Sequence, residues 1–278
     1  MLTLNSIKNM KGFDLPAIIL LIACLAGGCA TPPSPENKED VATFKEFNDP
    51  YEPFNRTMLE FNLAIDKAVV RPITSVYRQT VPDTLKDNLH NFIENLRSPV
   101  IFANDLFQGK LERAGNTLIR FVMNSTIGLF GFNDFATQTG IEKHGEDFGQ
   151  TLAAWDVGAG PYLVLPLFGP SNSRDAFGLI GDMLLDPFTW LAPMEVRLIR
   201  TGAKTIDKRS QKFDQINDLE KNSLDFYSAV RSLYRQRRLD QIRDGAPAAN
   251  NPAPGGLSES FRTNSKNLER NTVTWHNK

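Results

Sequence analysis

The spacing of apolar and polar positions predicts a mainly helical body over residues 44–245. One helix should follow Asp49, the expected N-cap, with Pro50 at its first position. Its apolar residues recur at helical spacing, and they are Phe54, Met58, Phe61, Ile65 and Ala68. A second helix should open at Val81-Pro82-Asp83, with the apolar stripe Leu85, Leu89, Phe92, Ile93 and Leu96.

The next segments are more apolar. Residues 100–107 are apolar apart from Asn104 and Asp105, and Gly109 should end that helix. A helix that is apolar nearly all round must be buried or in contact with lipid. Residues 110–124 return to an amphipathic pattern through Ala114, Leu118, Phe121 and Val122. The glycine- and phenylalanine-rich segment 127–135 fits either a bilayer interface or a buried loop.

The centre of the chain, residues 155–175, is too rich in glycine and proline for a long helix. The apolar stretches 162–165 and 167–168 predict a hairpin that is buried or faces a membrane. Ser171 or Ser173 should cap the following helix, which should end at Asp186-Pro187.

The segment 193–243 predicts further helices with a break near Asn222-Ser223. Residues 195–243 hold 12 basic and 7 acidic side chains. The cluster from Arg235 to Arg238 fits contact with anionic headgroups or an acidic partner, and equally a solvated helix face.

The N-terminal residues have the layout of a bacterial lipoprotein precursor. Two lysines precede an apolar run, and Gly27-Gly28 stand directly before Cys29. Residues 1–28 are therefore predicted to be a cleaved signal peptide, with Cys29 carrying the lipid. Cys24 is a second possible site, but only about seven apolar residues precede it. Residues 29–43 are expected to form a proline-rich tether, and residues 246–278 are expected to be a disordered tail.

Composition excludes several classes of protein. Both cysteines lie in the N-terminal segment, so disulfides and thiolate metal sites are not expected in the body. The formal net charge is −1, which gives no indication of nucleic-acid binding. Of the 19 phenylalanines, 15 lie between Phe44 and Phe188. This enrichment fits an aromatic core or a surface that faces lipid or a partner.

Candidate catalytic patterns fail on inspection. Gly158-x-Gly160 lacks the third glycine of a dinucleotide-binding turn and is followed by proline. Gly169-Pro-Ser171 approaches a nucleophile elbow, but the motif ends in serine at position 173 instead of glycine. The three histidines, His90, His144 and His276, do not show metal-ligand spacing.

An ordered set of short motifs resembles the MlaA (VacJ) lipoprotein family over about residues 48–245. The motifs are Asp49-Pro-Tyr-Glu-Pro-Phe-Asn-Arg56, Phe61-Asn62, Val70-Arg-Pro72, Val81-Pro82, Phe121-x-x-Asn124-x-x-x-Gly128, Phe132-x-Asp134-x-Ala136, Glu146-Asp-Phe-Gly-Gln-Thr-Leu152, Gly158-x-Gly-Pro-Tyr-Leu-Val-Leu-Pro166, Gly169-Pro-Ser171 and Arg174-Asp175.

The resemblance implies an all-α, ring-like domain in the inner leaflet of the Gram-negative outer membrane. Such a protein removes mislocalised phospholipid from the outer leaflet through a central channel. It passes the lipid to a periplasmic carrier protein of the Mla pathway and associates with an outer-membrane porin trimer. It is not an enzyme and uses no cofactor.

Channel-lining groups must be polar, because a charged headgroup crosses hydrocarbon only at high cost. Chemistry and motif position suggest Asn55, Arg56, Arg71 and Arg174, with structural salt bridges as the alternative. The expected gate is the hairpin marked by Gly158, Gly160, Pro161, Tyr162, Pro166, Gly169 and Pro170. A competing hypothesis is a structural or adaptor lipoprotein that tethers a periplasmic complex. A phospholipase is less well supported, because the chain offers no pair of nucleophile and base.

Overall fold

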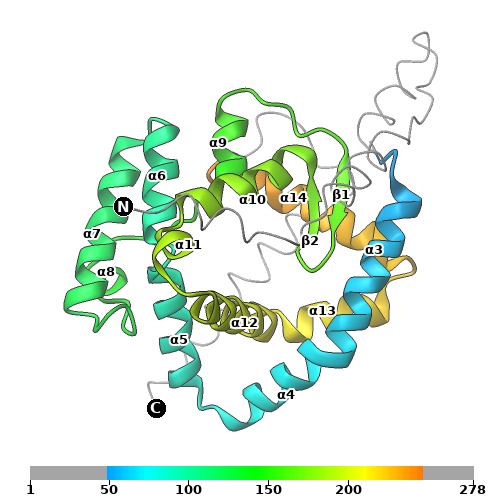
Figure 1. Cartoon of the computed structure of the whole chain (residues 1–278), viewed down its shortest axis with the longest axis horizontal. Coiled ribbons are helices and arrows are strands. Elements are labelled where there is room, and N and C mark those ends of the chain that lie inside the picture. Colours follow the sequence, from blue (N-terminus) through cyan, green and yellow to red (C-terminus); the bar gives the residue numbers. More distant parts are fainter. Residues whose placement is uncertain (1–48, 247–278) are drawn as a thin grey trace, which may run out of the picture. The chain divides into compact units, whose positions relative to one another are not determined.

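The structure is a computed structural model that describes residues 49–246 (Figure 1). The elements, in chain order, are α3 (Glu52–Ile65), the π-helix η2 (Asp66–Val70), α4 (Arg71–Thr80), α5 (Asp83–Asn95), α6 (Ser98–Phe107), α7 (Leu111–Thr126), α8 (Phe135–Gln138), α9 (Phe148–Ala154), β1 (Tyr162–Leu165), β2 (Gly169–Asn172), α10 (Ser173–Leu185), α11 (Pro187–Leu191), α12 (Met194–Gln211), α13 (Phe213–Asn222) and α14 (Phe226–Ile242). The predicted all-α class with one hairpin is confirmed. The chain divides into two units after Ile242, and all these elements belong to the first unit.

Helix α3 begins later than the sequence indicated. Its N-cap is Tyr51, so the prediction of Asp49 as the cap was wrong. The Asp49 carboxylate instead accepts hydrogen bonds from Asn55, Tyr227 and Arg231. The motif that seemed to start a helix therefore ties α3 to α14.

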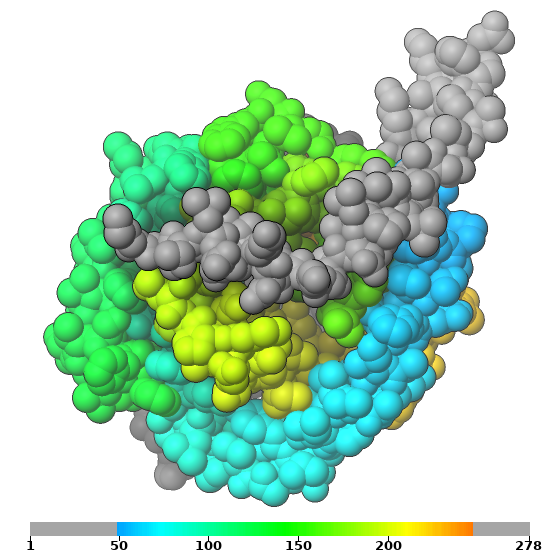
Figure 2. All heavy atoms as spheres, in the orientation of Figure 1, coloured from blue at the N-terminus to red at the C-terminus, as the bar shows by residue number. Residues whose placement is uncertain are grey.

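The helices of the first unit follow one another along an arc. Helices α3, η2 and α4 run without a break, because η2 passes directly into α4. Helix α12 lies inside this arc and packs against α4 and α5 (Figure 1). Figure 2 shows the same face, with the yellow-green atoms of α11 and α12 inside the blue and cyan atoms of α3 and α4.

The predicted hairpin is present as a two-stranded antiparallel sheet. Tyr162 lies opposite Asn172, and Leu165 lies opposite Gly169. Asn172, not Ser171 or Ser173, caps α10, because its side chain accepts a hydrogen bond from the Asp175 amide. As predicted, α10 ends just before Asp186-Pro187.

Packing in this unit is inverted relative to an ordinary soluble domain. Among the described residues, buried polar or charged side chains outnumber buried apolar ones by 18 to 10. Asn55, Asn104, Asp105 and Thr151 are completely inaccessible. Such side chains are buried at acceptable cost only when they are hydrogen-bonded. The apolar core is small and consists of Leu59, Tyr162, Val164 and Tyr227.

Helix α7 shows the inversion clearly. Its predicted apolar face is split, because Ala114 is buried while Leu118 and Val122 are about half exposed. Arg120 and Asn124 point inward instead. The helix was therefore predicted correctly, but its buried face was not.

Many large apolar side chains of the first unit are exposed, among them three groups. The segment after α7 exposes Ile127, Leu129, Phe130 and Phe132, so the alternative of a buried loop was wrong. The hairpin turn exposes Leu167 and Phe168. Helices α10 to α12 expose Phe177, Ile180, Met183, Leu184, Trp190, Leu191, Met194, Leu198 and Ile199. We call these three groups the apolar surface. None of the described helices is both long enough and apolar enough to cross a membrane.

Candidate functional site

A cavity of about 420 Å³ lies between the α5–α6 turn and helices α10, α11 and α12. Its lining is formed by Arg97, Val100, Leu179, Asp182, Met183, Asp186, Phe188, Thr189, Met194, Arg197, Leu198, Arg200, Thr201 and Lys204. This volume lies within the range of small-molecule sites.

One part of the cavity is apolar and opens outward. Met183, Met194 and Leu198 line it, and each is more than half exposed. The same three side chains belong to the apolar surface. A molecule lying against that surface can therefore enter the cavity without leaving apolar surroundings.

The other part of the cavity is cationic. Lys204 carries its ammonium group among other positive charges. Burial, together with the nearby cations Arg97, Lys208 and Arg200, lowers the pKa of Lys204 to about 8. An anion held at this position would relieve that repulsion.

Two aspartates balance part of the positive charge. Asp186 forms an ion pair with Arg200, whose guanidinium also lies 4.5 Å from the Phe188 ring centroid. Asp182 accepts hydrogen bonds from the Phe148 amide at 2.8 Å and from Asn104 at 3.1 Å. Burial raises the pKa of Asp182 to about 6, and the neighbouring charge of Asp147 contributes.

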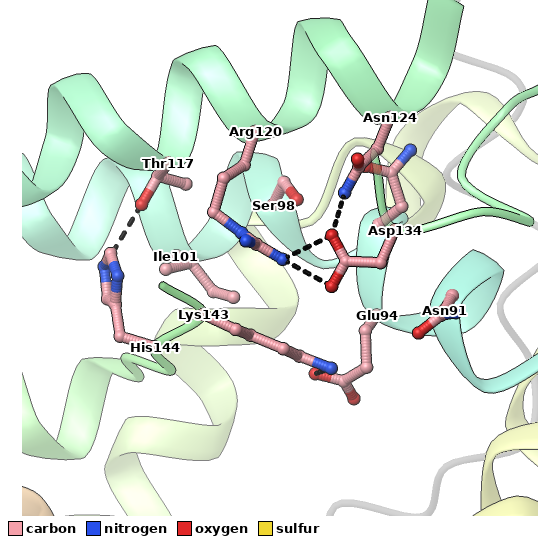
Figure 3. A pocket seen from close by; sticks show the side chains of 11 residues that line it. Asn91, Glu94, Ser98, Ile101, Thr117, Arg120, Asn124, Asp134, Lys143 and His144 are labelled. Carbon is pink, nitrogen blue, oxygen red and sulfur yellow. Dashed lines mark hydrogen bonds and ion pairs between the residues drawn. The ribbon is translucent and has the colours of Figure 1, made fainter. Parts of the chain in front are cut away.

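A second, much smaller pocket of about 30 Å³ lies among α5, α6, α7 and the loops around α8 (Figure 3). Arg120 donates hydrogen bonds to both carboxylate oxygens of Asp134 at 2.8 Å, and Asn124 donates to one of them at 3.0 Å. Burial opposes ionisation of Asp134, but hydrogen bonds from Thr137, Arg120 and Asn124 outweigh it and lower its pKa to about 2. This pocket is the size of a water molecule, and its contacts fix α8 to α7.

Asn55 is buried and holds the hairpin. Its amide donates to the Tyr162 carbonyl at 3.0 Å and accepts from the Val164 N–H at 2.8 Å. Asn62, seven residues later on the same face of α3, repeats this arrangement with Leu165 and Leu167. The outer edge of β1 is thus paired with side-chain amides instead of a third strand.

Two partly buried arginines predicted to line a channel, Arg56 and Arg71, form ion pairs. Arg56 pairs with Glu52 and Asp225 and lies 4.4 Å from the Tyr227 ring centroid. Arg71 pairs with Asp66 at 3.1 Å and with Glu220 at 2.7 Å. These contacts join the η2 region to α13 and the start of α14. A role in lining a channel stays a prediction for both residues.

Arg174 is buried beside Asp175, at 3.1 Å. Asp175 also accepts hydrogen bonds from Tyr234 and Arg238, and Arg238 binds Asp147 at 2.7 Å. The prediction of headgroup contact through the 235–238 cluster was thus wrong for Arg238, which is buried. Its pKa is raised, because these carboxylates outweigh the effect of burial. A role for Arg174 in lining a channel stays a prediction.

The hairpin predicted to be a gate contains glycines in the left-handed region and prolines with a restricted backbone. Gly160 and Gly169 adopt positive φ angles, of 67° and 82°, that glycine tolerates best. Pro161 and Pro166 restrict the backbone on either side of β1, and Pro170 restricts it within β2. A Cβ atom added to Gly160 would lie 2.9 Å from that of Ser173, whereas Gly158 has open space. Gating by this segment stays a prediction.

The groups considered for catalysis have other partners. The buried Ser171 hydroxyl donates to the Asn172 carbonyl at 3.3 Å. His90 lies within hydrogen-bond distance of Asp207, and His144 of Asp105. Across residues 49–246, no group of three or more His, Cys, Asp or Glu side chains is placed to hold a metal ion. His276 and Cys29 lie outside the described residues.

Sequence reasoning missed Arg97, Asp182 and Lys204 as site residues. A signal was present for one of them, because Arg200, Lys204, Lys208 and Lys212 recur every fourth residue. No local pattern connects Arg97 or Asp182 to this row, since only the packing of α5, α10 and α12 brings them together.

Comparisons with known proteins agree with the motifs. The MlaA lipoprotein family matches residues 47–241. An intermembrane phospholipid transport system lipoprotein MlaA from Haemophilus influenzae is 32% identical over 231 residues, covering 81% of this chain and 89% of that protein. The protein of the same name from Escherichia coli K12 is 35% identical over 203 residues, covering 71% and 79%.

A solved structure is also similar. It comes from work on the structural basis for maintenance of bacterial outer membrane lipid asymmetry. The match has a TM-score of 0.63 at 32% sequence identity, and it covers 70% of this chain and 98% of the other.

Proposed function

This chain belongs to the MlaA lipoprotein family, and from that membership we propose that it transports phospholipid and maintains the lipid asymmetry of the outer membrane. It removes mislocalised phospholipid from the outer leaflet and delivers it to a periplasmic carrier. One observation supports this most strongly: the cavity between α10 and α12 has a cationic part and an apolar mouth that opens onto the apolar surface.

The protein is proposed to lie in the inner leaflet of the outer membrane. The apolar surface includes Leu191, which is 83% exposed, and Ile199 and Phe130, which are each more than 70% exposed. Exposed apolar patches of this kind mark contact with a membrane or a partner. In a membrane, the inverted packing becomes favourable, because apolar groups face lipid while polar groups pair inside.

The cavity matches the two halves of a phospholipid. Acyl chains would lie along Met183, Met194 and Leu198, which are accessible from the apolar surface. The phosphate would lie toward Arg97 and Lys204. A headgroup passing here avoids the cost of crossing bare hydrocarbon.

The hairpin 158–170 is the proposed gate. Asn55 and Asn62 hold β1 against α3, so any movement has to occur at the ends of the hairpin. Gly158 and Gly160 precede β1 and supply the backbone freedom of a hinge. Asn55, Arg56, Arg71 and Arg174 remain proposed lining groups.

The chain is proposed to be anchored by lipid on Cys29 and to lie on the periplasmic side of the outer membrane. A porin trimer and a soluble periplasmic lipid carrier are the proposed partners. Transport requires no covalent chemistry, so no enzymatic step or cofactor is proposed. The contacts of Ser171, His90 and His144 are consistent with structural roles.

The test uses a Gram-negative host that lacks its own MlaA lipoprotein. Phospholipid exposed in the outer leaflet is quantified with and without this chain, and the same lipid extract is assayed for fatty acid and lysophospholipid. We expect the chain to restore low outer-leaflet phospholipid without lysophospholipid. Unchanged outer-leaflet phospholipid, with the chain present in the membrane, would contradict transport and favour an adaptor. Release of fatty acid by the purified protein would favour a phospholipase.

A further inference from the structure

A row of positive charges winds gradually around α12. Arg200, Lys204, Lys208 and Lys212 follow one another at four-residue intervals, and the last comes directly after the helix. Residues four apart lie on the same side of a helix, where like charges repel each other. The row extends over about 18 Å along the axis. An anion bound along the row would relieve this repulsion.

The row begins in the cavity and continues beyond it. Arg200 and Lys204 line the cavity. Burial lowers the pKa of Lys208 and Lys212, and the charge of Arg237 on α14 lowers both further. The second half of the row, with Lys208 exposed and Lys212 partly buried, therefore lies within electrostatic range of α14.

Carboxylates balance only part of the positive charge of the row. Arg200 is paired with Asp186. In the described part of the chain, no carboxylate lies within ion-pair distance of Lys204, Lys208 or Lys212. Glu94 is near the row, but it is paired with Arg97 at 3.3 Å and approached by Lys143 at 3.9 Å.

A further donor in the cavity lacks a partner. The Arg197 Nε atom is buried and makes no hydrogen bond, although another nitrogen of the same guanidinium donates to the Thr189 carbonyl. A buried donor without a partner is costly. An oxygen-rich anion such as a phosphodiester would satisfy it.

We infer that Lys204, Lys208 and Lys212 form a phosphate track, which binds the phosphodiester of the lipid headgroup in successive steps and makes phospholipids of net negative charge the preferred cargo. The inference rests on the proposed phospholipid transport. An anionic headgroup gains attraction at each step. The ammonium of a zwitterionic headgroup would instead face the same row of cations.

The experiment measures lipid bound by the full mature lipoprotein in non-ionic detergent. The protein is delipidated and exposed to equimolar dioleoyl phosphatidylglycerol and dioleoyl phosphatidylethanolamine, and bound lipid is quantified by mass spectrometry. We expect about tenfold enrichment of phosphatidylglycerol in the wild type. Each of Lys204→Gln, Lys208→Gln and Lys212→Gln should reduce the enrichment about two- to threefold.

Matched variants separate charge from general damage. Lys221→Gln changes an exposed lysine on α13 outside the track and should leave the enrichment unchanged. Lys204→Arg retains the charge and should recover most of the enrichment that Lys204→Gln loses. Loss of enrichment in Lys221→Gln, or its persistence in the triple glutamine variant, would overturn the track.

The remaining outcomes separate this inference from the proposed function. Equal binding of the two lipids by the wild type would overturn the preference and leave transport intact. Binding of neither lipid would overturn both. Millimolar inorganic phosphate should not displace the lipid, because it cannot fill the apolar part of the cavity. Displacement by phosphate would show a site for soluble phosphate and overturn the track.

Discussion

The side-chain oxygen of Asn55 accepts a hydrogen bond from the backbone N–H of Val164 at 2.8 Å, and both residues are completely buried. Val164 lies opposite Pro170 in the hairpin. Asn55 therefore provides the pairing that a neighbouring strand would otherwise supply. A residue chosen from the sequence for a channel instead fixes the edge of a sheet.

Replacing Asn55 with alanine should destabilise the fold. The Val164 N–H and the Tyr162 carbonyl would both lose a buried partner, at roughly 2 to 4 kcal/mol in total. Thermal unfolding in detergent measures the effect. Asn222→Ala, at an exposed site on α13, is the control and should change stability by less than about 0.5 kcal/mol. An Asn55→Ala protein as stable as the control would contradict the pairing described for β1.

The two glycines before β1 should respond differently to valine. At Gly160, the positive φ and the nearby Ser173 make any side chain unfavourable, so Gly160→Val should lower the Tm. Gly158 has neither constraint, so Gly158→Val should keep the Tm. If Gly158 is a hinge, this variant should still raise outer-leaflet phospholipid in cells. Normal lipid levels in Gly158→Val would argue against a hinge at this position.

Asp182 should make stability depend on pH. Its folded pKa of about 6 lies above the value of 3.8 for the unfolded chain, so the folded state holds the proton more tightly. The free energy of unfolding contributed by this group therefore falls as pH rises from about 4 to 6. Asp182→Asn keeps the hydrogen-bond acceptor and removes this loss. The free energy of unfolding of this variant should match that of the wild type near pH 4 and exceed it by up to about 3 kcal/mol at pH 7.5.

The measurement compares Tm values at the two pH values. Asp218→Asn, at an exposed position on α13, serves as the control for removing one negative charge. A Tm difference for Asp182→Asn that is the same at pH 4 and pH 7.5 would refute the raised pKa.

Ser171→Ala should leave function intact. The Ser171 hydroxyl makes one long hydrogen bond to Asn172, and Asn172 itself caps α10. Its loss should cost at most about 1 kcal/mol and should not change outer-leaflet phospholipid. Abolished function at an unchanged protein level, together with fatty-acid release by the wild type, would identify Ser171 as a nucleophile.

Sequence patterns predicted the elements better than their orientation. Helical periodicity located α5, α7 and α10, and glycine and proline located the hairpin. Periodicity cannot show which face points inward when the outside is apolar too. The apolar pattern of α7 therefore did not indicate that Arg120 and Asn124 are buried. Burial of these groups depends on partners such as Asp134, which only the tertiary fold brings into contact.

The cationic part of the cavity was predictable in part. The row from Arg200 to Lys212 can be read from the chain. The position of Arg97 beside Lys204 cannot, because the two residues are far apart in sequence and meet only through packing of α12 against α5. Arg56 and Arg71 were selected for their charge, yet each also pairs with a carboxylate distant in sequence, which lies just before α14 for Arg56 and on α13 for Arg71.

The central claim is that phospholipid passes through the cavity between α10 and α12, and a matched pair of cysteine variants tests it most directly. Thr201 lines the cavity, and Thr205 lies one turn further along α12 outside it. Both are exposed, and each hydroxyl donates to the carbonyl four residues earlier. The native thiol at Cys29 would be blocked by its lipid, so each variant carries one reactive cysteine.

Cells that carry Thr201→Cys or Thr205→Cys are treated with a charged maleimide small enough to pass through porins, and outer-leaflet phospholipid is then quantified. Labelling of Thr201→Cys should raise the outer-leaflet phospholipid to the level of cells without the protein, because the adduct fills the cavity. It should leave Thr205→Cys and unlabelled Thr201→Cys unchanged. Fully labelled Thr201→Cys with normal outer-leaflet phospholipid would contradict passage through this cavity.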